Sequence, residues 1–594
     1  MKKIIAITLC LLFFFSSYGQ HYLSPTRAAV DSKASKAYIV LSTSSALAKV
    51  DLDNENLIET VSLGFTPSDV CCSPDGQTVY VTEFAPYGKL HFVSLSSGKI
   101  VKSIPVGAYP TALCINKQGT QAWVANRFSD DVSVIDLVKK KEITRIKMVR
   151  EPKSLALSPD GKILAVCNLL PYQSSLDVPV SAKITLVDAE RMTVIDHITL
   201  PDGSQSVEDV CFSKDGTMLF ATHILSRYRF PTTQLERGWM NTNALSLIDV
   251  QNQRYYKTVL LDDMYRGAAN PCGMALSDDG ATLFVAASGT HELIAVDALA
   301  MLQKLSDPAF ADIADNLTFM AGLKKRIPSC GKGARYPFVY GEKVFVSDYF
   351  SGSLSVMNMQ ATDHKRVIKL GEEPAMSDIR KGELYFADAD LCFQHWQSCI
   401  SCHPDARADG LNWDLINDGL GNPKNTKSML YAHETPPCMI TGIRENAQIA
   451  VRAGIKHIQF ATRPEEDAAC IDAYLQSLTP LQSPYLTPKG TLSKLAQQGK
   501  KLFEQTGCLG CHDGPYLTDG KKYNVGTGIN EYTDFAFDTP TLKEIWKTAP
   551  YLYNGSAKTI REVLTTFNKA DKHGSTSHLT EDEIKALEAY ILSL

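Results

Sequence analysis

The sequence predicts a multidomain protein in which an all-β propeller is followed by two small all-α domains. Two observations predict this order. From about residue 30 to residue 390, short apolar strands and Asp-Gly turns recur in a unit of roughly 40 to 50 residues. After Asp390 the β pattern gives way to helical spacing, and a Cys-x-x-Cys-His motif occurs twice, at 399–403 and 508–512. The 594 residues suffice for several domains of about 100 to 200 residues each.

Residues 1–20 have the pattern of a secretory signal peptide. Lys2 and Lys3 form a basic start, an apolar run covers 4–15, and small and polar residues follow. The run is too short and wrongly flanked for a membrane span, so we expect none in the mature chain. Cleavage near Gly19 would release the chain into the periplasm.

The repeated unit of the first region is a strand, a turn and a second strand. The turn reads Ser-x-Asp-Gly in four copies, at 73–76, 158–161, 213–216 and 277–280. Asp-Gly is a strong turn signal between strands. Two further strands follow in each unit, and four short strands per unit are typical of a propeller blade.

Six blades can be read in full, and pieces at the two ends supply the rest. Strands near 37–40 and 57–63 open the region, and strands at 376–379 and 383–386 end it. A ring closed by one blade completed from both ends has seven blades, and eight also fit the sequence. The repeats resemble the YVTN family of β-propellers through Val79-Tyr80-Val81-Thr82 and Trp123-Val124-Ala125-Asn126.

Two long inserts interrupt the blades, at 226–243 and 302–337. Loops of this length in a compact domain are usually functional or disordered. The first insert is rich in groups suited to packing on a partner surface, namely Arg227, Tyr228, Arg229, Arg237 and Trp239. Either it is a solvated loop, or the inserts dock the following region onto one face of the propeller.

The two Cys-x-x-Cys-His motifs predict covalently attached haem c. The two thiols of a motif can form thioether bonds to the porphyrin, and the adjoining imidazole is then placed to bind iron. A zinc knuckle would bring a second Cys/His pair about a dozen residues away, and neither copy has one. The predicted attachment residues are Cys399, Cys402 and His403 in the first motif and Cys508, Cys511 and His512 in the second.

Composition limits the other roles of the chain. The formal net charge is −5 and no long basic run occurs, so nothing indicates a nucleic-acid partner. Of the 15 cysteines, those outside the haem motifs and the signal segment could pair in an oxidising compartment. Cys71, Cys114 and Cys211 each precede a repeat glycine by five residues, where a small buried thiol would serve equally well.

The haem motifs lie in two copies of one domain plan. Similar helices at 465–478 and 581–594 share the ending Ala-Tyr-x-x-Ser-Leu, and Thr580 with Glu583 predicts a capping box. An amphipathic helix at 492–503 precedes the second motif. This order of helix, motif, long loop and helix predicts cytochrome c-like domains at 391–480 and 488–594, joined by a proline-rich linker at 479–488.

The tandem domains resemble the bacterial di-haem cytochrome c peroxidases and the related methylamine-utilisation di-haem oxidases. The most specific match is the run 539–555, which begins Thr-Pro-Thr-Leu-Lys and ends Ala-Pro-Tyr-Leu-Tyr-Asn-Gly. The resemblance implies two haems c, a C-terminal haem that takes electrons from a redox donor protein, and an N-terminal haem that reduces hydrogen peroxide or another small oxidant. It also implies a possible calcium ion between the haem domains.

The second haem domain departs from the family pattern at its expected iron ligands. Tyr553 replaces the histidine of the matched run, and Phe567 stands where peroxidases carry an axial methionine. The sequence therefore predicts another sixth ligand for this iron. The candidates are His573, which we favour, and then His578 and Tyr553.

The first haem domain offers several residues that could approach iron, namely His433, His457, Met429 and Met439. A peroxidatic iron needs an open or displaceable position and a nearby base. Glu434 and Glu445 are the candidates for that base, although a lone glutamate is more often simply solvated. Trp396, Trp413 and Trp546 are near the motifs in sequence, and each is more often a core residue than an electron relay.

Taken together, the sequence favours a periplasmic di-haem oxidoreductase that reduces hydrogen peroxide. Two alternatives stay open: a non-enzymatic electron-transfer or partner-binding protein, and an oxidase acting on an organic or protein substrate. Spectroscopy separates them, because one high-spin and one low-spin haem indicate an enzyme and two low-spin haems indicate a carrier.

Overall fold

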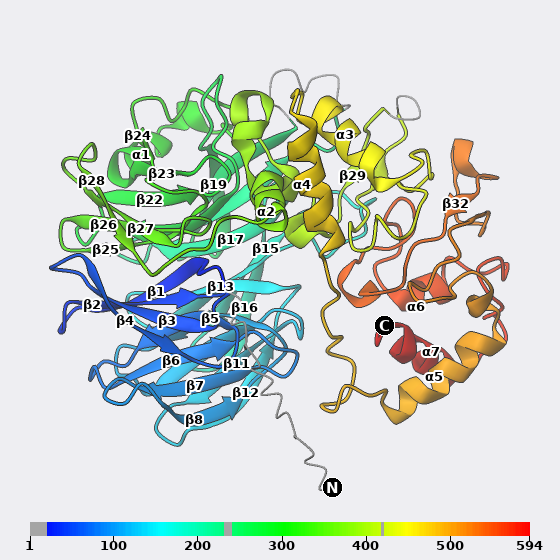
Figure 1. The fold of residues 1–594 in the computed structure, drawn as a ribbon, viewed down its shortest axis with the longest axis horizontal. Helices are drawn as coiled ribbons and strands as arrows, with labels where there is room; N and C mark the ends of the chain where they lie inside the picture. The colour runs from blue at the N-terminus through cyan, green and yellow to red at the C-terminus, as the bar shows by residue number, and fades with distance from the viewer. Residues whose placement is uncertain (1–20, 231–239, 417–420) are drawn as a thin grey trace, which may run out of the picture.

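A ring of seven four-stranded antiparallel sheets forms the N-terminal part of the protein (Figure 1). The computed structural model describes residues 21–230, 240–416 and 421–594. The predicted signal peptide, together with Arg237 and Trp239 of the first insert, lies outside these ranges. The propeller is confirmed, with seven blades rather than eight.

The blades are built one after another along the chain. The strands of the first four blades are β1 (Pro25–Asp31), β2 (Lys36–Leu41), β3 (Ala46–Asp51), β4 (Asn56–Ser62); β5 (Pro67–Cys72), β6 (Thr78–Glu83), β7 (Lys89–Ser94), β8 (Ile100–Pro105); β9 (Pro110–Ile115), β10 (Gln121–Asn126), β11 (Asp131–Asp136), β12 (Lys141–Lys147); β13 (Pro152–Leu157), β14 (Ile163–Asn168), β15 (Lys183–Asp188), β16 (Thr193–Thr199). Those of the last three are β17 (Ser204–Phe212), β18 (Met218–Ser226), β19 (Asn241–Asp249), β20 (Arg254–Leu260); β21 (Pro271–Leu276), β22 (Thr282–Ala287), β23 (Glu292–Asp297), β24 (Lys324–Pro328); β25 (Ala334–Tyr340), β26 (Lys343–Asp348), β27 (Ser353–Asn358), β28 (Lys365–Lys369).

The ring closes without a shared blade, which corrects the expectation from the sequence. Each sheet holds four consecutive strands, and the first and seventh blades meet side by side. Ser347 Oγ donates to the Thr26 carbonyl at 2.7 Å across this junction, and the Tyr340 hydroxyl is 2.6 Å from Ser35 Oγ. Packing between the blades, with apolar side chains of both in one core, therefore holds the ring closed.

The Asp-Gly turns form as the sequence predicts. In the second blade Ser73 Oγ donates to Asp75 Oδ1 at 2.5 Å, and the Gly76 amide donates to the Ser73 carbonyl at 2.9 Å. Gly76 has φ +68°, in the left-handed region that glycine adopts without steric cost. The same contacts recur in the three other copies, so one local sequence sets the same tight turn in four blades.

The prediction of propeller strands at 376–379 and 383–386 is wrong. The structure has helix α2 (Asp378–Ala387), capped by Ser377, whose side chain accepts from the Arg380 amide. The apolar run that resembles a strand instead packs against helix α4 (Glu465–Gln476). The last propeller strand is β28, and α2 is the first helix of the first haem domain.

The two haem domains share one architecture. In each, a helix crosses a C-terminal helix, and the haem motif, a two-stranded sheet and a further helix lie between them. The elements of the first are α2, the motif turn η5 (Cys399–Ser401), β29 (Asn412–Trp413), β30 (Lys424–Asn425), α3 (Ala447–His457) and α4; those of the second are α5 (Lys494–Gln505), η7 (Cys508–Gly510), β31 (Lys522–Tyr523), β32 (Phe537–Asp538), α6 (Ile560–Leu564) and α7 (Glu581–Ile591).

A glycine allows the close crossing of each helix pair. A Cβ on Gly382 would lie 1.9 Å from the Cys470 carbonyl oxygen, and one on Gly499 would lie 1.8 Å from that of Ala586. One turn further on, an aromatic pair seals each crossing. The ring centres of Phe386 and Tyr474 are 5.5 Å apart in the first domain, and those of Phe503 and Tyr590 are 5.3 Å apart in the second.

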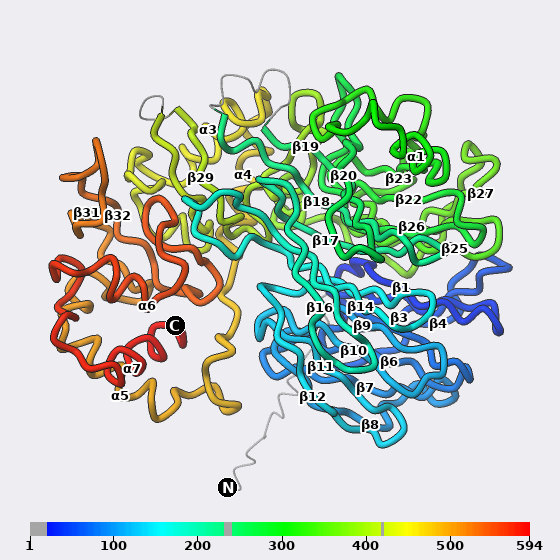
Figure 2. Tube along the Cα trace, turned by 180° about the vertical axis from the view of Figure 1, so that it is seen from behind, coloured from blue at the N-terminus to red at the C-terminus, as the bar shows by residue number. Residues whose placement is uncertain are grey.

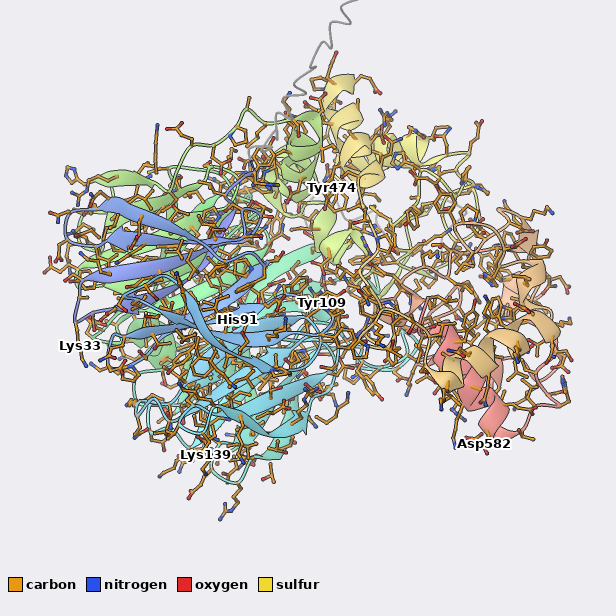
Figure 3. The ribbon with its side chains drawn as sticks, turned by 60° about the horizontal axis from the view of Figure 1, so that its bottom comes forward. Lys33, His91, Tyr109, Lys139, Tyr474 and Asp582 are labelled. Carbon is orange, nitrogen blue, oxygen red and sulfur yellow. The ribbon has the colours of Figure 1, made fainter. Side chains whose placement is uncertain are left out.

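The haem domains lie against one face of the propeller, and the segment between them follows its edge (Figures 1 and 2). Tyr109, at the edge of the propeller that faces them (Figure 3), donates to the Gln482 carbonyl at 2.9 Å. Gln205 Nε2 donates to the Ser401 carbonyl at 2.6 Å, inside the first haem motif. The propeller therefore covers one side of the first motif.

The first insert contacts the first haem domain directly, and the second insert contacts the first insert. Tyr228 packs in one apolar cluster with Leu411 and Trp413 of the first haem domain. The second insert forms helix α1 (Ala298–Leu305), a 3₁₀ turn (Pro308–Phe310) and strand β24, and it packs mainly on the sixth blade. Its Asp315 forms an ion pair with Arg227 at 2.5 Å, which joins the two inserts.

All fourteen cysteines in the described part of the chain are unpaired thiols, so none of the possible disulfides is present there. Cys71, Cys114 and Cys211 are partly buried thiols packed against the cores of the blades. In the described ranges, no helix combines the length and the apolar character that a membrane crossing needs.

Candidate functional site

The first motif lies on a short 3₁₀ turn at the junction of the first haem domain and the propeller. The Ser398 and Ser401 side chains cap this turn reciprocally. Ser401 Oγ donates to Asn270 Oδ1 at 2.7 Å, and Asn270 Nδ2 donates to Ser398 Oγ at 2.8 Å. Propeller side chains therefore fix the backbone that carries the two cysteines.

Two amide side chains reach the sulfur atoms of the first motif. Asn241 Nδ2, on β19 of the propeller, lies 3.4 Å from Cys402 Sγ. Gln459 Nε2, in the loop between α3 and α4, lies 3.3 Å from Cys399 Sγ. Burial raises the pKa of the Cys399 thiol to about 12, as expected for a group surrounded by apolar side chains.

The His403 ring is oriented by a hydrogen bond from its Nδ1 atom to the backbone. Its Nδ1 donates to the Arg407 carbonyl at 2.9 Å. Burial lowers the pKa of His403 to about 4, against the opposing effect of the Arg407 and Lys427 carbonyls. The ring is therefore neutral at physiological pH and has Nε2 available for a metal, the form in which imidazole binds iron.

The second motif has the same arrangement. His512 Nδ1 donates to the Leu517 carbonyl at 3.2 Å, and Cys508 Sγ lies 3.4 Å from Thr506 Oγ1. Burial lowers the pKa of His512, with the Leu517 carbonyl acting in the opposite direction. Nε2 of His512 is thereby left for iron.

His573, the favoured sixth ligand, lies beside this second motif. The ring centres of His573 and His512 are 6.3 Å apart. Its Nδ1 is buried without a hydrogen-bond partner among the described residues. Burial, and after it the neighbouring His512, lower the pKa of His573 to about 4, so its ring stays neutral. Asn568 fixes the loop by accepting from the His573 amide at 2.8 Å.

The other candidates for the second iron are engaged or exposed. The Tyr553 ring stacks on Phe537 at 4.4 Å between centres, and its hydroxyl accepts from the Ile529 amide at 3.4 Å. His578 is exposed at the surface. Phe567, in the position of the family methionine, is partly buried after α6. Of the three candidates, His573 therefore has the position that best suits a ligand of the second iron.

The sixth-ligand candidates of the first site are spread over the domain. His433 Nε2 is 2.9 Å from Asp472 on α4, while its Nδ1 is buried and unpaired within the described part of the chain. His457 is exposed in the last turn of α3. Met429 packs in the same apolar cluster as Cys399, and Met439 is partly buried further along the chain.

The predicted bases differ in burial. Glu434 is partly buried, and Glu445 is exposed just before α3. In the described part of the structure, the hydrogen bonds to the sulfur atoms of the first motif come from Asn241 and Gln459 instead. Sequence reasoning missed both of these residues. The signal available for Gln459 was its place in the loop that leads to the C-terminal helix α4, as His573 lies in the loop that leads to α7.

The tryptophans near the motifs are core residues. Trp396 is 1% exposed, and Trp413 donates from Nε1 to Asp409 Oδ2 at 2.9 Å. Trp546 packs edge-on against Phe128 of the propeller, at 5.1 Å between ring centres.

Asp409, which accepts from Trp413, is itself buried, and burial raises the pKa of its carboxyl group to about 6 despite the hydrogen bonds that it accepts.

A charge cluster joins the propeller and the two haem domains next to His403; its Arg127, Glu151 and Lys547 side chains are buried, and its Asp405 side chain is partly exposed. Asp405 pairs with Arg127 of the propeller at 2.6 Å and with Lys547 of the second haem domain at 3.1 Å. Arg127 also pairs with Glu151 at 2.8 Å. Burial alone would raise the pKa of Asp405, but the two cations outweigh it and hold that pKa well below its usual range.

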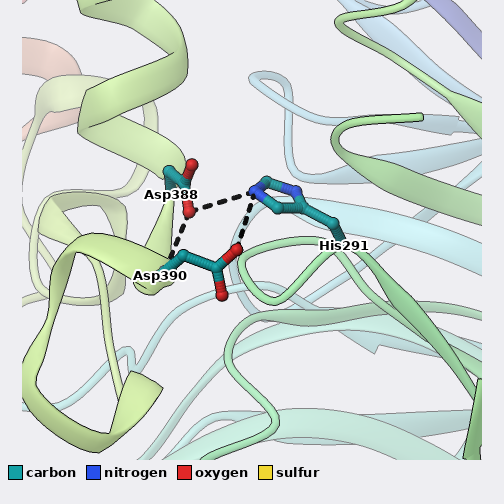
Figure 4. Close-up of side chains that lie close together, drawn as sticks. All are labelled: His291, Asp388 and Asp390. Atoms are coloured by element: carbon teal, nitrogen blue, oxygen red, sulfur yellow. Dashed lines mark hydrogen bonds and ion pairs between the residues drawn. The ribbon is translucent and has the colours of Figure 1, made fainter. Parts of the chain in front are cut away.

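A second polar cluster, His291 with Asp388 and Asp390, lies between the propeller and the first haem domain (Figure 4). His291 Nε2 is 3.0 Å from Asp388 Oδ1, and its Nδ1 accepts from the Gly333 amide at 2.9 Å. Because Nδ1 accepts a hydrogen, the proton of a neutral ring is on Nε2, the nitrogen that lies near Asp388. A protonated Nε2 does not suit a metal ligand, so calcium stays a prediction.

The residues of both motifs fit a covalently held haem. In each, two thiols three positions apart on one turn are followed by a histidine whose Nδ1 is bonded to backbone, which leaves Nε2 for iron. Around the second motif, the neutral imidazole of His573 lies 6.3 Å from that of His512, centre to centre. Around the first, an amide side chain lies beside the cysteine sulfur instead.

Comparison with known proteins agrees with this class of site. Residues 496–594 match the cytochrome c family model. Hydrazine synthase subunit gamma of Kuenenia stuttgartiensis is 27% identical over 36% of this chain and 77% of its own length. Cytochrome-c peroxidase IdrP2 of Pseudomonas sp. (strain SCT) is 24% identical over 37% of this chain and 81% of its own length.

A solved structure shows the same fold over a larger part of the chain. The hydrazine synthase structure from Kuenenia stuttgartiensis superposes with a TM-score of 0.53 at 22% identity, and covers 57% of this chain and 96% of the matched chain. Fold, site and relatives together support a haem c redox enzyme of the di-haem cytochrome c kind.

Proposed function

We propose that the protein is a periplasmic di-haem c-type oxidoreductase that reduces hydrogen peroxide. A redox donor protein delivers electrons at the C-terminal site, and peroxide is reduced at the site of Cys399, Cys402 and His403. The net reaction combines one peroxide with two electrons and two protons and gives two water molecules. The unequal surroundings of the two motifs carry this proposal: His573 beside His512, and Gln459 beside Cys399.

Haem, when bound, supplies iron that stores electrons and binds a small oxidant where its sixth position is open. His573 would take that position at the second site, as suits a site that only passes electrons. At the first site, the Gln459 amide lies 3.3 Å from Cys399 Sγ, and in this proposal it donates a hydrogen bond to an oxygen of the oxidant. Glu434, partly buried, is the proposed proton carrier, and the exposed Glu445 is the second choice.

The experiment is a spectrum followed by an assay on the purified, haem-loaded protein. One high-spin and one low-spin haem, with cyanide binding to the high-spin one, support the proposal. The pre-reduced protein must then consume peroxide faster than free haem does. Two low-spin haems that ignore cyanide and peroxide would instead establish an electron carrier.

The likeness to hydrazine synthase subunit gamma favours a second candidate function. In this alternative the first site acts on a nitrogen compound, with the same two sites and the same direction of electron flow through the second. The two functions differ in the substrate that the first site turns over. Parallel assays of peroxide and of hydrazine with one preparation distinguish them.

A further inference from the structure

The proximal histidine of each site, meaning the one that follows the second cysteine, donates to one backbone carbonyl and has a second backbone carbonyl nearby. His403 donates from Nδ1 to the Arg407 carbonyl at 2.9 Å, and the Lys427 carbonyl also faces its ring. Arg407 and Lys427 both carry cationic side chains, whereas the corresponding residues of the second domain are uncharged. The partners of these two side chains show what holds the Arg407 and Lys427 backbone in place.

The carbonyls around His512 come from corresponding positions. They belong to Leu517, at 3.2 Å from Nδ1, and to Pro540. Leu517 and Arg407 both lie five residues before the first strand of the small sheet of their domain, β31 and β29. Pro540 and Lys427 both lie two residues after the second strand, β32 and β30.

The Arg407 side chain crosses into the second haem domain. Its Nε and Nη2 bind the two carboxylate oxygens of Glu544 at 2.5 and 3.1 Å. The side chains of Arg407 and Glu544 are 6% and 0% exposed, so this two-point contact is shielded from water. The Lys427 side chain makes a similar crossing to Asp538, in a less buried position. Both residues that hold His403 are thus anchored in the other domain.

The contact on the opposite side of the interface is aromatic. Tyr431 occupies, in the first domain, the place that Glu544 occupies in the second, because each lies six residues after the end of the second strand of its small sheet. Its ring lies 4.9 Å from that of Tyr516, centre to centre. Tyr516 is the neighbour of Leu517, whose carbonyl holds His512. Each domain therefore braces the segment that orients the proximal histidine of the other.

We propose that Arg407 and Glu544 are a positioning pair for the first haem site, through which the second haem domain sets the orientation of His403. The ion pair fixes the Arg407 carbonyl, and that carbonyl fixes the direction and the hydrogen-bond strength of the imidazole. A stronger Nδ1–H bond makes a histidine a more basic ligand. Tyr431 has the reciprocal role for His512. The inference rests on the proposed pair of haem sites, but not on peroxide as the substrate.

Glu544→Gln in the full-length, haem-loaded protein tests this. The variant keeps the side-chain shape and removes the charge that holds Arg407. The iron–histidine vibration of the reduced first haem should shift, and its affinity for cyanide should change about tenfold or more, while the low-spin signal of the second haem stays in place. Tyr431→Leu should do the converse, perturbing the second haem although Tyr431 belongs to the first domain.

Two further variants provide an alternative to Glu544→Gln and a control. Asp538→Asn releases Lys427, whose side chain is 24% exposed, and serves as the second variant if Glu544→Gln does not fold; it should shift the first haem in the same direction and by less. Arg561→Gln breaks an ion pair with Glu581 and Glu588 that stays inside the second domain, and should shift neither haem. Variants that lower the melting temperature but leave the first haem as in the wild type would overturn the proposal. Peroxide turnover is not part of this readout, so failure of the proposed reaction would leave the result intact.

Discussion

The ring centre of His573 lies 6.3 Å from that of His512. A metal–imidazole nitrogen bond is about 2 Å long, so two imidazoles on opposite sides of one ion have ring centres about 6 Å apart. The separation would therefore suit a single iron held between the two rings. The loop that carries His573 already holds this distance, because Asn568 bonds both to its amide and to its carbonyl.

His573→Ala should convert the second haem from low-spin to high-spin, because the sixth ligand is lost. Absorption and electron paramagnetic resonance spectra of the purified variant check this. His578→Ala, at an exposed histidine five residues on, is the matched control and should leave both spectra as in the wild type. A low-spin second haem in the His573 variant would show that another residue binds this iron.

Gln459→Leu should slow peroxide turnover by the first haem about 100-fold, because a buried donor that meets developing charge typically contributes that much. Gln448→Leu, on the exposed face of α3, is the control for a change of the same kind in the same domain. The rate is measured with pre-reduced protein under saturating peroxide. Equal rates in the two variants would remove Gln459 from the reaction.

Local sequence signals predicted most of the fold. The Asp-Gly turns and the alternation of apolar residues identify the blades because each turn is closed by its own Ser and Asp side chains. The run 383–386 was misassigned because an apolar stretch of this length suits a strand or a buried helix equally well. Only the contact of Gly382 with Cys470 on α4, about ninety residues further on, decides for the helix.

The site was predictable only where chemistry is encoded in spacing. Cys-x-x-Cys-His fixes the attachment residues in both domains, and the loss of the usual ligands at Tyr553 and Phe567 pointed to His573. Asn241 could not be found in the same way, because its role depends on how the propeller docks on the first motif. Arg407 and Glu544 were equally hidden, since the contact between them joins domains that the sequence does not place relative to one another.

Gly382→Ala and Gly499→Ala should each destabilise the haem domain that contains them by about 1–3 kcal/mol, because the new methyl group forces the crossed helices apart. The backbone carbonyl that each Cβ would meet cannot move aside as a flexible side chain would. Gly454→Ala is the control. It lies inside α3 with nothing within 4 Å of its Cβ position, so it should stabilise by about 0.5–1 kcal/mol. Urea unfolding followed by haem absorption measures all three, and a neutral Gly382→Ala would contradict the close crossing.

His223 should make the propeller sensitive to mild acid. It is fully buried on β18, donates from Nδ1 to the Ile224 carbonyl at 3.1 Å, and lies with Nε2 2.7 Å from Ser246 Oγ. Burial lowers the pKa of His223 to about 4, below the ordinary value of about 6.5, so between these values the unfolded chain binds a proton that the folded chain does not. The stabilisation is complete above pH 6.5 and is lost as the pH falls toward 4, by about 3 kcal/mol in all.

His223→Gln should remove that part of the acid sensitivity, because the amide can donate to the same carbonyl and does not titrate. His364→Gln, at an exposed histidine of the last blade, should keep it. Hydrogen exchange of the β18 and β19 amides at pH 7.5 and at pH 4.5 isolates the propeller from the haem domains. Since His223 is largely neutral in the folded protein at both pH values, the protection of these amides should fall with acid in the wild type and in His364→Gln, and fall much less in His223→Gln. An equal fall in all three proteins would place the acid sensitivity in other groups of the propeller.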